Sequence, residues 1–243
     1  MRIGLIFQAR ANSKRLKNKI FKKINNKTIL DLFIRRIKRA NKVNCIIAAT
    51  TKNPKDDKTV YISKKNGINI FRGSERNVLS RFFNAAKKYK LDLVVRCNAD
   101  CPFIDYNLID KMIQNYKNSY DYYSNILIPT FPSGMHIEII KFNALEKAYS
   151  LANKSIDKEH VTPFIYNHRK LFKVANYKNS KNLSFHRWTL DFKEDFLFIK
   201  RIYKEMNYKE DFNSQSILKI LKKKPNIMNI NYHIEKKQNL IAK

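Results

Sequence analysis

Residues 93–105 read Leu-Val-Val-Arg-Cys-Asn-Ala-Asp-Cys-Pro-Phe-Ile-Asp, and the rest of the chain is organised around this stretch. The apolar run 93–95 predicts a buried strand, and Pro102, which has no backbone N–H, ends its pairing. Because ligands bind at the carboxyl ends of strands in open α/β sheets, Asp100 is a candidate oxygen ligand for Mg²⁺. The alternative role for Asp100 is to cap a helix that begins near Asp105.

The same order of strand and helix extends from this stretch towards the N-terminus. Further apolar runs predict strands at 3–7, 43–49 and 68–71. Apolar residues at helical spacing predict helices that start near Thr28, after Asn53-Pro54, near Val78 and after Asp105. Strands that alternate with helices in this way predict βαβ units and a parallel sheet.

Beyond residue 120 the pattern is less regular. We predict strands at 120–128, 135–140, 172–177 and 185–190, helices at 144–151, 159–167, 195–206 and 214–222, and a polar tail after Pro225. The chain shows no internal repeat and no linker rich in Gly, Ser or Pro. We therefore predict a single domain over residues 1–243.

The composition is that of a globular protein with an unusual charge. Apolar residues make up 44% of the 243 residues, whereas the formal net charge is +30. Such a charge suits an anionic partner such as nucleic acid, a membrane surface or a phosphorylated small molecule. Lys and Asn are, however, spread over every segment, and no basic arm or helix stands out. We therefore interpret the charge as compositional bias and expect no nucleic-acid partner.

The cysteines and the apolar runs bear on location. Cys45, Cys97 and Cys101 form no C-x-x-C pair, which argues against a zinc site or a disulfide framework, and Cys45 is expected to be buried. The N-terminus lacks the pattern of a signal peptide, and no apolar run is long enough to span a membrane. We expect a cytoplasmic protein without a membrane partner.

Two groups of residues can carry phosphate and metal chemistry. The loop after the first strand holds Arg10, Arg15 and Lys19, which can bind phosphates, although it lacks the glycines of a P-loop and its charges can also be simply solvated. Asp100 and Asp191 each follow an apolar run, so two adjacent strand ends can present two carboxylates to one Mg²⁺. The alternative role for Asp191 is to cap the next helix.

Five ordered blocks of sequence resemble one enzyme family. They are residues 8–19, 71–74 with 78–81, 96–105, 159–163 and 187–191. They are similar to Q-A-R-x-x-S-x-R-L-P-G-K, F-R-G-S with V-L-x-R, R-x-T-[AG]-D-C-P-L-I-D, E-H-V-T-P and R-W-T-V-D. These motifs belong to the cytidylyltransferases typified by spore-coat polysaccharide biosynthesis protein F, which are related to the acylneuraminate and 3-deoxy-manno-octulosonate cytidylyltransferases. The similarity covers residues 2–206, and several ordered blocks make it specific.

The resemblance implies a fold and a reaction. The fold is a three-layer α/β/α sandwich with a mixed, mainly parallel sheet, as in nucleotide-diphospho-sugar transferases. The reaction joins CMP from CTP to a sugar or sugar acid with release of pyrophosphate, for surface glycans. A glycosyltransferase on the same fold, a non-catalytic protein that binds anions or nucleic acid, and a degenerate paralogue are the alternatives.

The resemblance also implies roles for individual residues. Arg10, Arg15 and Lys19 would be catalytic, and Asp100 and Asp191 would hold Mg²⁺. The nucleotide would contact Gln8, Ala9, Arg10, Arg15, Lys19, Arg72, Ser74, Asn98 and Asp100. The acceptor would contact Arg81, His136, Glu138, Glu159 and His160. A homodimer is expected, with residues 120–180, around 125–170 in particular, as the candidate subregion for acceptor binding and dimerisation.

The chain departs from the family pattern at several positions of the predicted site. Lys17-Asn18 replaces Pro-Gly in the loop, so its backbone is less constrained. Asn98 replaces Thr, and His136 stands where the pattern often has Asp. Arg96, which directly follows the predicted strand, is a candidate partner in a structural ion pair.

Overall fold

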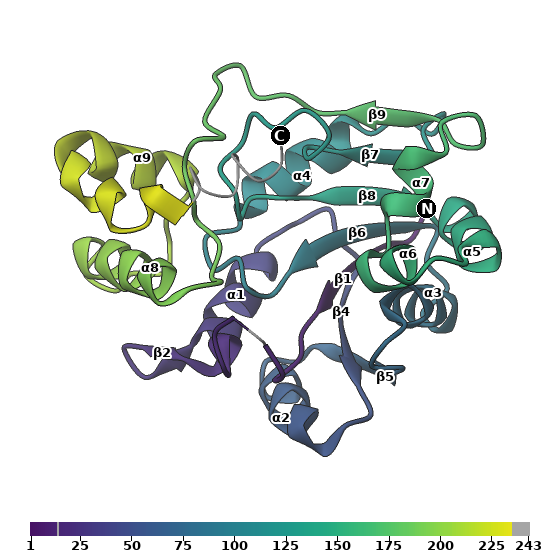
Figure 1. Cartoon of the computed structure of the whole chain (residues 1–243), viewed down its shortest axis with the longest axis horizontal. Helices are drawn as coiled ribbons and strands as arrows, with labels where there is room; N and C mark the ends of the chain where they lie inside the picture. The colour runs from purple at the N-terminus through teal and green to yellow at the C-terminus, as the bar shows by residue number, and fades with distance from the viewer. Residues whose placement is uncertain (14, 235–243) are drawn as a thin grey trace.

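The computed structural model describes residues 1–13 and 15–234, and these residues fold around one large sheet (Figure 1). Its strand order is β5-β4-β1-β6-β8-β7-β9. The strands are β1 (Ile3–Gln8), β4 (Cys45–Thr51), β5 (Asn69–Gly73), β6 (Leu93–Asn98), β7 (Tyr122–Ser124), β8 (Glu138–Lys141) and β9 (Val174–Asn176). Strand β8 runs antiparallel to β6 and β7, and the other neighbouring strands are parallel. The predicted mixed, mainly parallel sheet is confirmed.

Helices cover both faces of the sheet, which gives the three predicted layers. One face packs against α1 (Ile29–Ile37), α2 (Asp57–Lys65), α4 (Tyr106–Asn115), α8 (Lys193–Glu205) and α9 (Ser214–Lys223). The other packs against α3 (Val78–Lys88), α5 (Phe142–Leu151) and α7 (Pro163–Asn167), and α6 (Ser155–His160) lies against α3. Figure 1 shows α3, α5, α6 and α7 gathered on one side of the molecule, with α8 and α9 on the other.

Local sequence explains where the first helix begins. The Thr28 hydroxyl accepts a hydrogen bond from the Asp31 backbone N–H at 3.1 Å, and the Asp31 carboxylate accepts one from the Thr28 N–H at 3.1 Å. This reciprocal capping satisfies two backbone donors that a helix start otherwise leaves free. The 3₁₀ helix η1 (Lys19–Phe21) comes before α1 in the chain, and a short hairpin of β2 (Lys23–Ile24) and β3 (Lys27–Thr28) connects the two.

The predicted strand at 185–190 is wrong. The segment forms one isolated bridge, between Ser133 and Arg187, because its backbone groups bond to turns instead of a neighbouring strand. Trp188 N donates to Ser133 O at 2.7 Å, and Leu190 N donates to Asp100 O at 2.9 Å. The apolar run therefore reflects burial of Trp188 and Leu190 in the core, not strand pairing.

Two other predictions beyond residue 120, a strand and a helix, need correction. The strand predicted at 120–128 ends at Ser124, because the Asn125 side chain bonds to the backbone of Met135 and Ile137 in place of a ladder. The single helix predicted at 159–167 is two helices, because Pro163 lacks the N–H that a continuous helix needs and Val161 has a φ of 74°.

The region after Pro225 was predicted to be a polar tail. Its first part is the 3₁₀ helix η3 (Pro225–Ile230), with Ile227 and Asn231 buried, and residues 235–243 lie outside the described part. Cys45 is partly exposed, contrary to expectation, and the described cysteines are free thiols. No helix in the described ranges is both long and apolar enough to cross a membrane.

Candidate functional site

The strand order reverses at β1, and the candidate site lies at that point. Strand β4 pairs with one edge of β1 and β6 with the other, so the connections leave in opposite directions. Gln8 at the carboxyl end of β1 and Asn98 at the carboxyl end of β6 are register partners. Such a reversal leaves a crevice above the strand ends, where ligands bind in open α/β folds.

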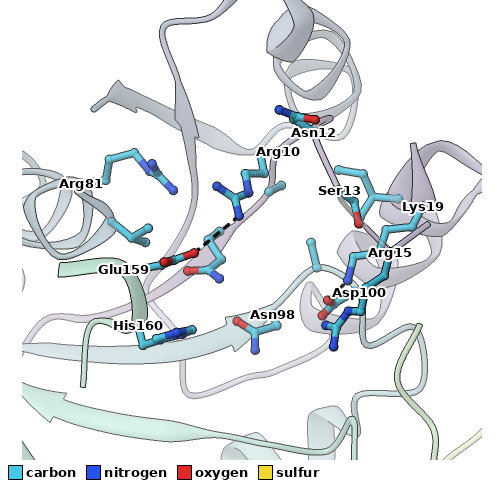
Figure 2. A pocket seen from close by; sticks show the side chains of 15 residues that line it. Arg10, Asn12, Ser13, Arg15, Lys19, Arg81, Asn98, Asp100, Glu159 and His160 are labelled. Atoms are coloured by element: carbon cyan, nitrogen blue, oxygen red, sulfur yellow. Dashed lines mark hydrogen bonds and ion pairs between the residues drawn. The ribbon is translucent and has the colours of Figure 1, made fainter. Parts of the chain in front are cut away.

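A cavity of about 450 Å³ occupies this crevice (Figure 2). Ten of the predicted site residues line it: Gln8, Ala9, Arg10, Arg15, Lys19, Arg81, Asn98, Asp100, Glu159 and His160. Figure 2 shows Arg15, Lys19 and Asp100 at one end and Arg10, Arg81 and Glu159 at the other. The end of β1 with the loop after it, the end of β6 with the residues after it, α3 and α6 therefore line the cavity.

The loop after β1 is fixed to the sheet at its start. The buried Asp56 carboxylate accepts a hydrogen bond from the Ala11 N–H at 2.6 Å and another from the Thr51 hydroxyl. At the other end Asn18 has a φ of 54°, in the left-handed region that Asn tolerates better than most residues. Gly also adopts this backbone conformation readily, so Asn18 can replace the Gly of the family pattern without a change of the main chain. Lys19 begins the 3₁₀ helix directly after Asn18.

Lys19 forms ion pairs with both Asp100 and Asp191, the two carboxylates predicted to act together. Its Nζ contacts Asp100 Oδ2 and lies 2.8 Å from Asp191 Oδ1. Arg15 Nη2 lies 2.6 Å from the same Asp191 oxygen, and Arg187 Nη2 lies 3.4 Å from Oδ2. Asp100 and Asp191 therefore converge on one cation, although Asp191 is not at a strand end.

The charges at this cluster stabilise one another. Burial by itself lowers the pKa of Lys19, but the carboxylates of Asp100 and Asp191 outweigh it and raise the pKa above its usual value. Burial likewise raises the pKa of Asp191, but Lys19, Arg15 and Arg187 outweigh it and lower the pKa. The lysine is thus ammonium and Asp191 is carboxylate at neutral pH.

Asp191 is positioned by residues that the sequence did not single out. Asp195 Oδ2 accepts hydrogen bonds from the backbone N–H groups of Asp191 and Phe192, at 2.8 and 2.9 Å. Its Oδ1 accepts from Arg187 Nε at 2.8 Å and from Asn231 Nδ2 at 3.0 Å. Asp195 therefore caps the start of α8, and the alternative capping role for Asp191 is wrong. An acidic residue three positions after a helix start was the available signal.

The alternative capping role for Asp100 is also wrong. Asp105 caps α4 through a hydrogen bond from the Asn107 N–H to its carboxylate at 3.0 Å. Asp100 faces the cavity instead, with 23% of its side chain exposed. Both carboxylates are consequently available to the site and not used in helix capping.

The other end of the cavity carries two guanidinium groups. Arg10 Nη2 lies 3.9 Å from Glu159 Oε1. Arg81 donates to the backbone oxygens of Ser74 and Glu75, the latter at 3.2 Å. Burial and then the charge of Arg10 lower the pKa of Arg81 to about 10. Two neighbouring cations with one exposed carboxylate make this end suitable for an anion.

Five predicted site residues do not line the cavity, and Asp191, described above, is one of them. Arg72 holds β4 and β5 together, donating to Thr51 O at 2.8 Å and Asn53 O at 3.0 Å. The Ser74 hydroxyl accepts from Asn77 N at 3.1 Å. The remaining two are the partly buried His136 and the buried Glu138.

Glu138 lies in the sheet, where both of its oxygens are engaged. Arg96 donates to Oε1, and the Tyr122 hydroxyl donates to Oε2 at 2.7 Å. The predicted ion pair of Arg96 is thereby found, with Glu138 as its partner. The roles predicted for these residues in binding substrate stay predictions.

The donor set suits Mg²⁺. Two carboxylates already converge on one cation, the Lys19 ammonium, and such oxygen ligands are those that Mg²⁺ uses together with waters and substrate phosphates. Within the described ranges no group of three or more His, Cys, Asp or Glu side chains is arranged as a metal site. The ion that fits is therefore one that shares its coordination with a ligand.

Comparison with known proteins points to one family. Residues 4–236 match the cytidylyltransferase family model. The chain is 39% identical over 245 residues to the uncharacterized protein MJ1063 of Methanocaldococcus jannaschii, covering 98% of this chain and 97% of that protein. It is 30% identical over 231 residues to the spore coat polysaccharide biosynthesis protein SpsF of Bacillus subtilis, covering 92% and 95%. A solved cytidylyltransferase from Leptospira borgpetersenii superposes with a TM-score of 0.89 at 33% identity, covering 94% and 97%.

Proposed function

This chain belongs to the cytidylyltransferase family, and from that premise we propose that it transfers CMP from CTP to a sugar or sugar acid with release of pyrophosphate. The observation that supports this most directly is the convergence of Lys19, Asp100 and Asp191 beside Arg15 at the point where the strand order reverses. A triphosphate requires concentrated positive charge, and the cavity is lined by four cationic side chains, those of Arg10, Arg15, Lys19 and Arg81.

In the proposed reaction a hydroxyl oxygen of the acceptor attacks the α-phosphorus of CTP. A new P–O bond forms, the bond between the α-phosphorus and the bridging oxygen breaks, and the hydroxyl proton is lost to solvent. Arg10, Arg15 and Lys19 neutralise the charge of the triphosphate and of the leaving pyrophosphate. Positioning and charge neutralisation account for most catalysis in transfers of this type.

Asp100 and Asp191 are the residues that would hold Mg²⁺, and the bound ion would add Lewis-acid stabilisation of phosphate oxygens. Asp191 is held in place by Asp195 and Arg187, so its carboxylate is preorganised for this role. Asp100 is the more exposed of the two and faces the cavity directly. Asp191 would thus be the fixed ligand of the ion, and Asp100 the ligand that faces the cavity.

We place the acceptor near Glu159 and His160, at the part of the cavity away from Lys19. The name of the B. subtilis relative concerns spore coat polysaccharide biosynthesis, and a CMP-activated sugar for a surface glycan fits that context. Exposed apolar side chains at Ile128, Leu151 and Ile156 lie in the region predicted for dimerisation, and the homodimer stays a prediction.

The function is tested by pyrophosphate release. The purified protein is incubated with CTP, UTP, ATP or GTP, with Mg²⁺ and a panel of sugar acids and sugar phosphates. We expect release with CTP and a subset of acceptors, and a loss of about 10²–10³-fold in Asp100→Asn and Asp191→Asn. Glu146→Gln, at an exposed position of α5, is the matched control and should retain full activity.

Three outcomes would each contradict part of the proposal. Full activity in either aspartate variant would rule out the assigned metal ligands. Consumption of a nucleotide sugar without any use of CTP would identify a glycosyltransferase instead. Salt-sensitive RNA binding with no turnover of CTP would support the non-catalytic alternative.

A further inference from the structure

Lys19 occupies the place between the two predicted metal ligands. Its ammonium group contacts a carboxylate oxygen of Asp100 and lies 2.8 Å from one of Asp191. Only 14% of the side chain is exposed. Within the described residues its hydrogen-bond partners are these two carboxylates. The carboxylate pair thus has a cation of its own.

The two carboxylates are also already neutralised before any ligand binds. Asp191 faces Lys19, Arg15 and Arg187, and Asp100 faces Lys19. Arg187 is shared with Asp195, but Arg15 and Lys19 still balance the two carboxylates. A divalent ion that entered between Asp100 and Asp191 would meet the ammonium at close range, and like charges in a partly buried site repel strongly. Lys19 must therefore leave before the ion can enter.

Lys19 has a way to leave. It lies on the wall of the cavity, next to Arg15, and its unbranched stem can turn the ammonium from the carboxylates towards the cavity. A triphosphate in the cavity offers it new anionic oxygens. The same phosphate oxygens supply the ligands that two carboxylates alone do not provide for Mg²⁺.

We propose that Lys19 is an internal counter-ion that is exchanged for the divalent ion when the nucleotide binds. It holds Asp100 and Asp191 together in the free protein and prevents metal binding there. Binding of the triphosphate draws Lys19 away and admits the ion, so that metal binds with or after the nucleotide. This inference rests on the proposed metal site and adds an order of binding to it.

The test measures binding of Mn²⁺ alone by electron paramagnetic resonance, without nucleotide. Wild-type protein should bind Mn²⁺ weakly, and Lys19→Met, which removes the charge but keeps the length of the side chain, should bind at least tenfold more tightly. Addition of CTP should strengthen Mn²⁺ binding in the wild type by tenfold or more and in Lys19→Met by much less. The double variant Lys19→Met/Asp100→Asn should lose the gain, which places the ion on Asp100.

The matched control is Lys17→Met, an exposed lysine of the same loop that has no ion pair within 4.0 Å among the described residues. It removes the same charge from the protein and should leave nucleotide-free Mn²⁺ affinity unchanged. An equal gain in Lys17→Met would overturn the proposal, because net charge and not Lys19 would then set the affinity. Circular dichroism and thermal melting verify folding, and Lys19→Gln replaces the methionine variant if that variant does not fold.

Two further results would overturn the inference. One is tight Mn²⁺ binding by wild-type protein without nucleotide, equal to that of Lys19→Met. The other is a folded Lys19→Met or Lys19→Gln protein with no gain in affinity. Neither measurement depends on turnover, so loss of the proposed transferase activity with the Mn²⁺ results intact would reject the function and leave the exchange standing.

Discussion

Gly134 lies so close to the main chain of Trp188 that a β-carbon at position 134 would stand 2.6 Å from the Trp188 carbonyl carbon and 2.7 Å from the Thr189 nitrogen. Its φ of 100° is also one that residues with a β-carbon rarely adopt. Around this contact Ser133 N donates to His186 O at 2.9 Å and Trp188 N donates to Ser133 O at 2.7 Å, which supports the segment leading to Asp191. A glycine outside the cavity therefore helps to place a carboxylate within the candidate site.

Gly134→Ala should consequently damage both stability and the site. The added β-carbon meets backbone, which cannot rotate away, so we expect the free energy of unfolding to fall by about 3 kcal/mol or more. Gly67→Ala is the control, because Gly67 also has a positive φ, of 70°, but nothing lies within 4 Å of its β-carbon position. It should cost only about 1 kcal/mol. Urea denaturation of both variants checks the difference, and equal losses would contradict it.

Arg36 connects the first helix to a distant turn. Its guanidinium is buried beside the Phe212 ring, and it donates to Ile104 O at 2.9 Å and to Phe212 O at 3.0 Å. Arg36→Met leaves those buried carbonyl oxygens without donors, so we expect a loss of about 2–4 kcal/mol in unfolding free energy. Arg39→Met, which removes an exposed contact with Asp211, should cost less than about 1 kcal/mol.

His186 should make the free energy of unfolding depend on pH. This residue is buried between Phe185 and Trp188, and burial lowers its pKa to about 4. The unfolded chain takes up a proton near pH 6.5, whereas the folded protein resists protonation until about pH 4. Stability is therefore unaffected above pH 6.5 and falls as the pH drops through the interval between these values.

A shift of this size corresponds to about 3 kcal/mol at most, at about 1.4 kcal/mol per pH unit. His186→Phe should remove that part of the acid sensitivity and make the difference between wild type and variant grow from pH 6.5 to 4. Denaturant unfolding across this range measures it. Parallel profiles for wild type and His186→Phe would show that His186 does not titrate in this way.

Local patterns were sufficient to predict the first half of the fold. Strong apolar runs, the cap at Thr28 and the Asp105 cap of α4 depend on neighbours in sequence. The resemblance supplied the mixed sheet. Prediction failed where backbone bonding was decided by distant partners, as at Trp188, whose N–H bonds to a turn and not to a strand. Apolar character indicates burial there but not the partner of the backbone.

The candidate site shows the same division. The positions of Arg10, Arg15 and Asp100 on one cavity follow from strand ends meeting at one edge of a sheet. The contact of Lys19 with both carboxylates depends on loop conformation. Asp195, which supports Asp191, lies four residues from it, but the partner of Asp195, Asn231, is on chain that returns from beyond α9. Local spacing predicts the Asp195 cap but not the contacts of Lys19 or Asn231.

The last prediction concerns Arg96 and Glu138, which face each other as register partners on β6 and β8. Both side chains are at least nine-tenths buried, and Arg96 donates to Glu138 while Tyr122 donates to its other oxygen. Breaking a buried pair leaves an uncompensated charge, so Arg96→Met and Glu138→Gln should each cost about 3–5 kcal/mol. The double variant should cost clearly less than the sum, because neither charge remains.

A double-mutant cycle by urea denaturation measures this coupling, and additive losses would show that the two groups do not depend on each other. The same proteins decide the role of Glu138. If it contacts the acceptor, Glu138→Gln should raise the KM for the acceptor more than Arg96→Met does. With both oxygens of Glu138 already bonded, we expect instead that the two variants change KM alike, in proportion to their loss of stability. Glu138 then acts on the site by holding Arg96 and the sheet beneath the cavity, and not by contact with the proposed acceptor.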